Sequence, residues 1–365
     1  MDPALTLVTV HMRARLSMSA DLPKDRAPSI RDVARLAGVS HQTVSRVLNN
    51  HPSIRETTKA RILQAMEELQ YRPNQAARAL SKGRSRTIGV LTASSAQYGL
   101  ARSVAAIEDA ARRHGYFVNS ANLSVADPAA IEDALEHLLD QAVEGFVIIA
   151  PQERVFDVLE RLDIAVPYVS LQSTGMHDLR ALAADQILGA KMATRHLIDL
   201  GHREIVHLAG PQDWNEAEAR MRGFLLEIDD ADLMTHPPIL GDWTADFGYF
   251  AGQELLRSRD FSAVFAANDE MALGLLHALH DARLNVPGDV SVVGFDDVPV
   301  ASHSWPPLTT VHQDFDLIGQ SAFASLLAAM GTPLDVAAGS SVPRLVVRGS
   351  TGPVPVSRLP LLKRY

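Results

Sequence analysis

From residue 87 onward the chain alternates short apolar runs with amphipathic stretches of helical length, and this alternation limits the fold more than any other feature. Strands that are separated by helices pair in parallel, and the helices then cover both faces of the sheet. The clearest apolar runs are residues 88–91, 146–150, 168–171, 205–209, 263–266 and 291–295. The sequence therefore predicts a body of doubly wound, parallel α/β sheets.

Polar side chains follow the ends of several of these predicted strands. In doubly wound sheets, ligands bind beyond the carboxyl ends of the strands. The residues in such positions are 93–95, Asn268, Asp269, Asp296, Asp297, Gln313 and Phe315, with Trp243 as an aromatic candidate nearby. Carboxylates, amides and an aromatic face suit the hydroxyls and the apolar face of a sugar ring. Three alternatives stay open: Asp297 could cap a turn, Asn268 could cap the next helix, and Trp214 could pack on the surface.

The charge of the chain is divided unequally along its length. Residues 24–86 carry thirteen Lys or Arg and five Asp or Glu, whereas residues 87–365 carry nineteen and thirty-six. The overall net charge of −9 therefore hides a basic segment in front of an acidic body. This arrangement is typical of a nucleic-acid binder whose body stays off the DNA.

Three short amphipathic helices are predicted within the basic segment. Ser29 with Asp32 resembles a capping box in front of the first helix, which should end at Gly38. Ser40 can cap the second helix, in which Val44, Val47 and Leu48 point inward. A third helix over about residues 55–70 should bury Ile62, Leu63, Met66 and Leu69.

The outward face of the second predicted helix is polar. It carries His41, Gln42, Ser45, Arg46 and Asn49. Arg pairs with guanine, Gln pairs with adenine, and short polar side chains reach phosphate oxygens, so this face is suited to reading DNA. A helix face that is merely solvated is the alternative.

The same segment resembles a known family. Residues 30–50 read IRDVARLAGVSHQTVSRVLNN and residues 71–80 read YRPNQAARAL, and both runs are similar to the DNA-binding head of the LacI/GalR family of transcriptional regulators. The resemblance implies an all-α helix-turn-helix head. It implies further that His41, Gln42 and Arg46 read bases, and that Thr43, Ser45 and Asn49 contact phosphates.

By the same resemblance, residues 74–81 form a hinge helix that enters the minor groove beside a second copy. Leu80 takes the position of the family's wedging leucine, and Asn74 and Ala77 are further hinge contacts to DNA. An apolar wedge unstacks a base step and bends the duplex. Because so short a helix is marginal alone, its folding should depend on DNA.

The body also resembles this family, which shares a two-lobed core with periplasmic sugar-binding proteins. The matching segments are HLAGP at 207–211, ANDEMALG at 267–274, SVVGFDD at 291–297 and PLTTVHQDF at 307–315. The resemblance implies that Arg220, Asn268 and Asp296 bind effector hydroxyls and that Trp243 and Phe315 pack on the effector. Gln313, which follows a predicted strand, is assigned to the same site. The loop at 93–102 and Ala150 depart from the family's polar pattern, which leaves the identity of the effector open.

These observations predict five segments: an arm or misassigned start at 1–28, the head at 29–73, the hinge and linker at 74–86, the two-lobed core at 87–354 and a tail at 355–365. The tail has no sustained leucine heptad, which favours a homodimer over a helical tetramer. The expected partners are a near-palindromic DNA operator, a small sugar-like effector and a second copy of the chain.

Several function classes are excluded or disfavoured. The chain has no cysteine, which excludes disulfides and thiolate metal sites, and no metal or cofactor is expected. It has no P-loop, nucleophile elbow or zinc-protease motif, and the adjacent Asp296 and Asp297 should point to opposite faces, so an enzyme is not expected. With no signal peptide or membrane span in view, the cytoplasm is the expected location.

Two rival functions remain. A solute-binding transport protein would share the core but need export, and an architectural DNA-binding protein would have no use for a two-lobed body. Whether the effector releases or strengthens DNA binding, and which genes are controlled, stays open.

Overall fold

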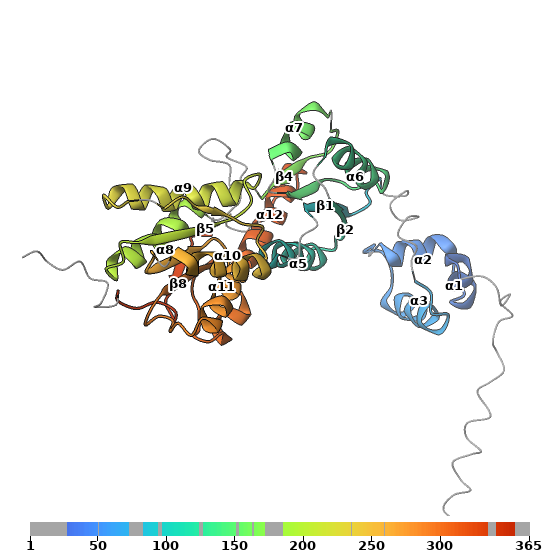
Figure 1. The fold of residues 1–365 in the computed structure, drawn as a ribbon. Coiled ribbons are helices and arrows are strands. Elements are labelled where there is room, and N and C mark those ends of the chain that lie inside the picture. Colours follow the sequence, from blue (N-terminus) through green and yellow to red (C-terminus); the bar gives the residue numbers. More distant parts are fainter. Residues whose placement is uncertain are drawn as a thin grey trace, which may run out of the picture. The chain divides into compact units, whose positions relative to one another are not determined.

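The computed structural model describes residues 28–49, 51–72, 83–93, 97–123, 127–150, 153–162, 164–171, 185–234, 236–258, 260–334 and 341–354. The chain divides into two compact units, residues 1–85 and residues 86–365 (Figure 1). The predicted hinge residues Asn74, Ala77 and Leu80 lie outside the described residues, as do residues 1–27 and the tail.

The smaller unit contains three helices around a small apolar core. They are α1 (Ile30–Leu36), α2 (His41–Leu48) and α3 (Glu56–Glu68). Val33, Val44 and Ile62, one from each helix, are fully buried against one another. The prediction that Leu63 belongs to this core is wrong, because its side chain is 49% exposed and Ile62 and Ala65 occupy the inner face of α3 instead.

Local hydrogen bonds fix the ends of these helices. The backbone N–H of Ser29 donates to Asp32 Oδ2 at 2.9 Å, as the capping-box pattern predicts, and the Ser29 hydroxyl donates to the same oxygen at 2.6 Å. Ser40 Oγ accepts the N–H of Thr43 at the start of α2. Arg61 on α3 donates to the carbonyl of Ala37, and so ties the third helix to the turn after α1.

The first lobe of the larger unit is a four-stranded parallel sheet in the order β2-β1-β3-β4. Its strands are β1 (Thr87–Ala93), β2 (Phe117–Leu123), β3 (Phe146–Ile149) and β4 (Tyr168–Ser170), and its helices include α5 (Tyr98–Arg113), α6 (Pro128–Asp140) and α7 (Glu153–Arg161). The central strand β1 is almost wholly buried, which matches its apolar sequence.

The second lobe is a six-stranded sheet in the order β10-β9-β8-β7-β5-β6, parallel except for the edge strand β10. Its strands are β5 (Ile205–Ala209), β6 (Ile239–Leu240), β7 (Ala263–Ala266), β8 (Ser291–Asp296), β9 (Thr309–His312) and β10 (Arg344–Val346). The accompanying helices are α8 (Gln186–Asp199), α9 (Asn215–Asp230), α10 (Ala245–Ser258) and α11 (Asp269–Asp281), with a 3-10 turn at Pro299–His303.

The chain crosses between the lobes more than once. Helix α12 (Phe315–Ala329) follows the second-lobe strand β9 but packs against α5, β3 and β4 of the first lobe. Its residues Phe323 and Leu326 share one apolar cluster with Ile107 and Val147. The chain then returns to the second lobe in β10, so neither lobe is a continuous stretch of sequence.

The predicted doubly wound architecture is confirmed, and each of the six clearest apolar runs is a strand. Strand β2 is absent from those predicted runs. It lies at the edge of its sheet and carries exposed or half-buried polar residues, Asn119, Ser120 and Asn122, so it has no continuous apolar signal.

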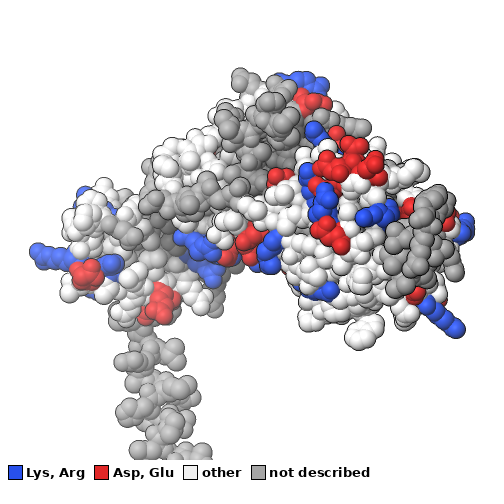
Figure 2. Space-filling view, turned by 90° about the vertical axis from the view of Figure 1, so that its left-hand side faces the viewer, with Lys and Arg blue, Asp and Glu red and all other residues white. Residues whose placement is uncertain are grey.

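Charges of both signs are mixed on the surface of the larger unit, and Asp and Glu lie beside Lys and Arg on the face drawn in Figure 2. Ion pairs of this unit include those of Arg113 with Asp109 at 2.7 Å and of Lys191 with Glu227 at 3.1 Å. The acidic excess of this unit is therefore interspersed with basic side chains on that face.

Helices α10 and α11 approach so closely that only glycine fits between them. A Cβ on Gly274 would collide with the carbonyl oxygen of Ala245, and one on Gly248 would collide with that of Met271. We therefore expect Gly274→Ala to destabilise the core by about 1–3 kcal/mol, since backbone cannot yield as a side chain can. Thermal unfolding of the full chain measures this, with the exposed Gln253→Ala on α10 as control. An unfolding temperature equal to that of the control would contradict the expectation.

Candidate functional site

The polar face of α2 is accessible to solvent. His41, Gln42, Arg46 and Asn49 are exposed, while Thr43 and Ser45 are half-buried. Val44 and Val47 hold the opposite face in the core of the head. The six residues assigned to DNA by resemblance thus lie on the part of α2 that a duplex can reach, which is a necessary condition for that role.

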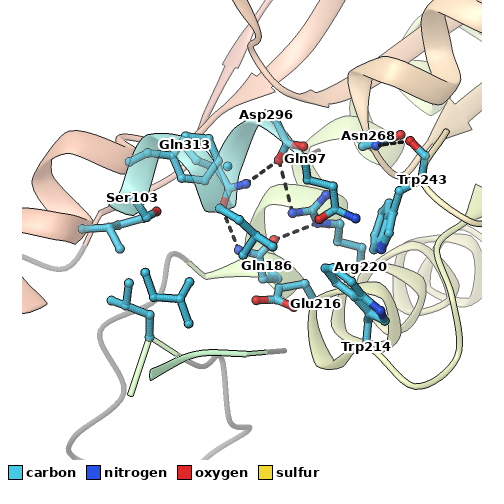
Figure 3. Close-up of a pocket in the computed structure, with 16 residues that line it drawn as sticks. Gln97, Ser103, Gln186, Trp214, Glu216, Arg220, Trp243, Asn268, Asp296 and Gln313 are labelled. Atoms are coloured by element: carbon cyan, nitrogen blue, oxygen red, sulfur yellow. Dashed lines mark hydrogen bonds and ion pairs between the residues drawn. The ribbon is translucent and has the colours of Figure 1, made fainter. Parts of the chain in front are cut away.

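A pocket lies at the carboxyl ends of the strands of both lobes (Figure 3). The space that it encloses is about 630 Å³, including the solvent-filled space at its mouth. The structure brings together all six residues predicted for the effector site, namely Arg220, Trp243, Asn268, Asp296, Gln313 and Phe315. Five of them stand at or just after the ends of strands β6 to β9, as the topology predicts, whereas Arg220 lies within helix α9.

Four side chains in the pocket form a closed ring of hydrogen bonds (Figure 3). Arg220 Nε donates to Gln186 Oε1 at 2.8 Å, and Gln186 Nε2 donates to Gln313 Oε1 at 2.6 Å. Gln313 Nε2 donates to Asp296 Oδ1 at 2.6 Å, and Arg220 donates to the same oxygen at 3.3 Å. Each member fixes the orientation of the next, so the ring holds its polar groups in place before any ligand arrives.

Asp296 is held in an unusual conformation at the end of β8. Its φ of 106° lies in a region that residues other than glycine rarely adopt, and such strain is often found at binding sites. Both bonds from the ring end on Oδ1, and no described residue donates to Oδ2. Burial raises the pKa of Asp296 to about 7, although Arg220 acts in the opposite direction. Its Oδ2 is therefore an acceptor without a protein partner among the described residues.

Arg220 is packed between aromatic rings. Its guanidinium carbon lies 4.0 Å from the centre of the Phe295 ring and 5.5 Å from that of Trp243, and it also donates to the carbonyl of Ala267. The Trp243 indole lies against Gly210, where any side chain would collide with it. These contacts fix both the cation and the aromatic wall of the pocket.

Asn268 serves two structural roles beside the pocket. Its Oδ1 accepts the N–H of Met271 at 2.9 Å, so it caps α11, and its Nδ2 donates to the carbonyl of Trp243 at 2.9 Å. The sequence left open whether Asn268 caps the next helix, and the structure shows that it does. The Nδ2 group carries two hydrogens, of which this second bond uses one.

The two walls of the pocket differ in polarity. The first lobe and α12 contribute mostly apolar side chains, and the second lobe contributes most of the polar groups. The apolar wall contains Leu100, Ile149, Leu171, Phe315 and Ile318, and Phe315 is held edge-on by Tyr98 at 5.9 Å. A ligand with one hydroxyl-bearing edge and one apolar face would match both walls.

Ten of the sixteen lining residues were absent from the predicted site. Gln97, Gln186 and Glu216 stand at or near helix starts, away from the strand ends that guided the prediction. The spacing of Glu216 and Arg220, four residues apart, was a usable signal, because such residues share one helix face. The sequence left open whether Trp214 lies in the cleft or packs on the surface. It lines the pocket, and its ring lies at 65° to that of Trp243.

The neighbours of Asn268 and Asp296 do not line the pocket. Asp269 is fully buried and accepts the Thr310 hydroxyl at 2.6 Å and the Val298 N–H at 2.8 Å. Asp297 pairs instead with Arg348 and with His312. The two adjacent aspartates therefore point in different directions, as predicted, and only Asp296 faces the cavity.

We expect Asp296→Asn to gain stability relative to the wild type as the pH rises. Burial raises the pKa of Asp296 to about 7 in the folded state, compared with an ordinary value of 3.8. The charged residues that act on Asp296 are Arg220, Glu216 and Glu270. The folded state therefore binds this proton more tightly than the unfolded state, and wild-type stability falls as the pH rises between these two values. The asparagine variant lacks this titration. Unfolding temperatures of both proteins at about pH 5 and about pH 8 test the expectation, because shared titrations cancel in the difference. A difference that does not change with pH would contradict it.

Metal sites and membrane-spanning helices are not found in the described ranges. No group of three or more His, Asp or Glu side chains within them is placed to hold a metal ion. In the same ranges, no helix is long and apolar enough to cross a membrane.

Comparisons with known proteins agree with this geometry. The model of bacterial regulatory proteins of the lacI family matches residues 29–74, and that of the periplasmic binding protein-like domain matches residues 194–351. The lactose operon repressor of Escherichia coli (strain K12) is 35% identical over 298 residues, which cover 81% of this chain and 83% of the repressor.

The comparison with solved structures also finds transcriptional regulators. A lac repressor dimer bound to operator and the anti-inducer ONPF aligns with a TM-score of 0.81 and 32% identity, covering 90% of this chain and 100% of that one. A complex of the transcriptional regulator CelR with cellobiose aligns with a TM-score of 0.64 and 31% identity, covering 88% and 99%. The chain therefore belongs to the lacI family of bacterial regulatory proteins, and it is a DNA-binding transcriptional regulator.

Proposed function

We propose that the chain represses transcription as a homodimer, whose two heads bind a near-palindromic operator. In this proposal His41, Gln42 and Arg46 read bases, and Thr43, Ser45 and Asn49 contact phosphates. Two recognition helices related by symmetry must face related half-sites about one helical turn apart. The accessible polar face of α2 supports the assignment, as does the similarity to a lac repressor dimer bound to operator.

The hinge completes the DNA-binding part of the proposal. Residues 74–86 join the head at 29–73 to the core at 87–354, with Asn74 and Ala77 contacting DNA and Leu80 wedging open the central base step. The family assignment is the support for this part.

We propose further that the pocket binds a sugar or sugar derivative, which controls operator binding. The observation that carries this proposal is the ring of Arg220, Gln186, Gln313 and Asp296, which orients polar groups toward the cavity beside two tryptophans. Sugar hydroxyls need such donors and acceptors, and the apolar wall suits the rest of the ring. A cellobiose complex among the similar structures supports a sugar as ligand.

We propose that this regulator acts in the cytoplasm and catalyses no reaction. The similar proteins named above are transcriptional repressors or regulators.

A two-step experiment tests the function. The full-length protein first selects its operator from a random pool of double-stranded DNA, and a symmetric consensus is expected. Thermal unfolding is then measured against a panel of mono- and disaccharides, because a ligand that binds only the folded state raises the unfolding temperature. A sugar that raises it and also changes operator affinity supports the proposal. An asymmetric consensus counts against the homodimer, and a panel without any effect on either readout counts against the sugar.

A further inference from the structure

Two buried polar atoms in the pocket have no hydrogen-bond partner among the described residues. One is Glu216 Oε2, an acceptor, and the other is Trp243 Nε1, a donor. A buried polar atom without a partner costs free energy, and such atoms in a pocket mark groups that a ligand completes. Neither atom takes part in the ring around Asp296, so the two atoms mark a second polar region of the cavity.

Glu216 stands in the first turn of α9, one helical turn before Arg220. Burial raises the pKa of its carboxyl, and Arg220 counteracts this effect. Figure 3 shows Glu216 and Trp214 on the same side of the cavity as Arg220. The Glu216 carboxylate is therefore part of the pocket wall, and it forms no ion pair with a described residue on the protein surface.

The charges around the cavity are unbalanced. Its lining contains one basic residue, Arg220, and two acidic residues, Asp296 and Glu216. The guanidinium of Arg220 is already bonded to Gln186, the carbonyl of Ala267 and Asp296. A third carboxyl, that of Glu270 outside the lining, accepts the N–H of Tyr98 and also keeps an oxygen without a partner among the described residues. No described lining residue offers a free cation to a negatively charged ligand.

We propose that Glu216 is a specificity-determining contact, which accepts a hydrogen bond from an effector hydroxyl and excludes sugars that carry a phosphate or carboxylate. This inference rests on the proposed sugar-binding function. An uncharged sugar supplies the missing donor to Oε2. An anionic sugar brings a further negative charge beside the carboxyls of Glu216 and Asp296, and no described lining residue offers a free cation to pair with it. Like-charge repulsion, or the proton uptake that relieves it, therefore weakens its binding.

The test is isothermal titration calorimetry on the full-length protein with matched sugars. The uncharged probes are glucose, galactose, lactose and cellobiose, and the anionic probes are glucose 6-phosphate, galactose 6-phosphate, glucuronate and galacturonate. We expect at least one uncharged probe to bind, and its anionic counterpart to bind about 100-fold more weakly or worse. An anionic probe that binds as tightly as its uncharged counterpart overturns the proposal.

Variants then assign the selectivity to one side chain. Glu216→Gln keeps the shape and an acceptor oxygen but removes the charge, so we expect the gap between uncharged and anionic sugars to shrink by about tenfold. Glu218→Gln is the matched control, because Glu218 is exposed on the same helix. The same gap in Glu216→Gln as in Glu218→Gln overturns the role of Glu216.

Two variants distinguish a wrong role for Glu216 from a wrong sugar site. If Asp296→Asn abolishes binding of an uncharged sugar while Glu216→Ala leaves it unchanged, the sugar site stands and the role of Glu216 falls. If no probe binds the wild type, both the sugar site and the role of Glu216 are overturned. Thermal unfolding of each variant confirms that it is folded.

Discussion

Arg46→Ala is expected to weaken operator binding by about 10- to 100-fold per half-site, and to relax the preference for guanine at the base pair that Arg46 reads. The guanidinium lies exposed on α2, and two parallel hydrogen bonds to one guanine would be lost. Binding to wild-type and base-substituted operators at several salt concentrations measures this effect. The loss should be largest on the wild-type operator and small on operators in which that guanine is replaced.

The control is Arg35→Ala, which removes the same charge from an exposed position on α1. It should lower affinity only slightly and equally for all sequences, because long-range attraction does not distinguish bases. If Arg46→Ala also weakens every sequence equally, Arg46 contacts a phosphate and the base-reading assignment is wrong.

Arg220→Ala and Asp296→Asn are each expected to abolish the response to the effector while operator affinity without effector is retained. Each removes charge-assisted hydrogen bonds worth about 1.5–3 kcal/mol, which is about one to two decades in affinity. The loss should exceed that of the bonds to one side chain alone, since each member of the ring orients the next. Operator affinity is measured as a function of effector concentration for each variant.

The matched control is Arg222→Ala, because Arg222 lies two residues from Arg220 on the exposed side of α9. It should respond to the effector as the wild type does. A normal response from both Arg220→Ala and Asp296→Asn would place the effector site elsewhere. Loss of operator binding by either variant would indicate instead that the fold had been damaged.

Local rules were enough to predict most of the architecture. The caps at Ser29 and Ser40 depend on side chains a few residues away, so their pattern is visible in a short window. The buried strands are continuous apolar runs, and parallel topology places their carboxyl ends together. Asn268, Asp296, Gln313 and Phe315 could therefore be grouped from the predicted strand ends, with Trp243 as the nearby aromatic, whereas Arg220 was assigned by the family resemblance.

The remaining features depend on packing between distant parts of the chain. Leu63 has a helical spacing that suits burial, but the head is too small to cover more than one face of α3. Gln186 stands 127 residues from Gln313, its partner in the ring, and nothing near it in sequence indicates a binding site. Its role follows only from the way in which α8 meets the end of β9.

The path of α12 also sets an order of events during synthesis. This helix completes the apolar core of the first lobe, yet its residues 315–329 leave the ribosome after strands β5 to β9 of the second lobe. Chains fold from the N-terminus as their units are completed, and the head has all of its core residues once Tyr71 has emerged. A nascent or truncated chain that ends before α12 therefore holds a finished DNA-binding head with an unfinished pocket. Such a fragment could occupy DNA but could not be switched by an effector.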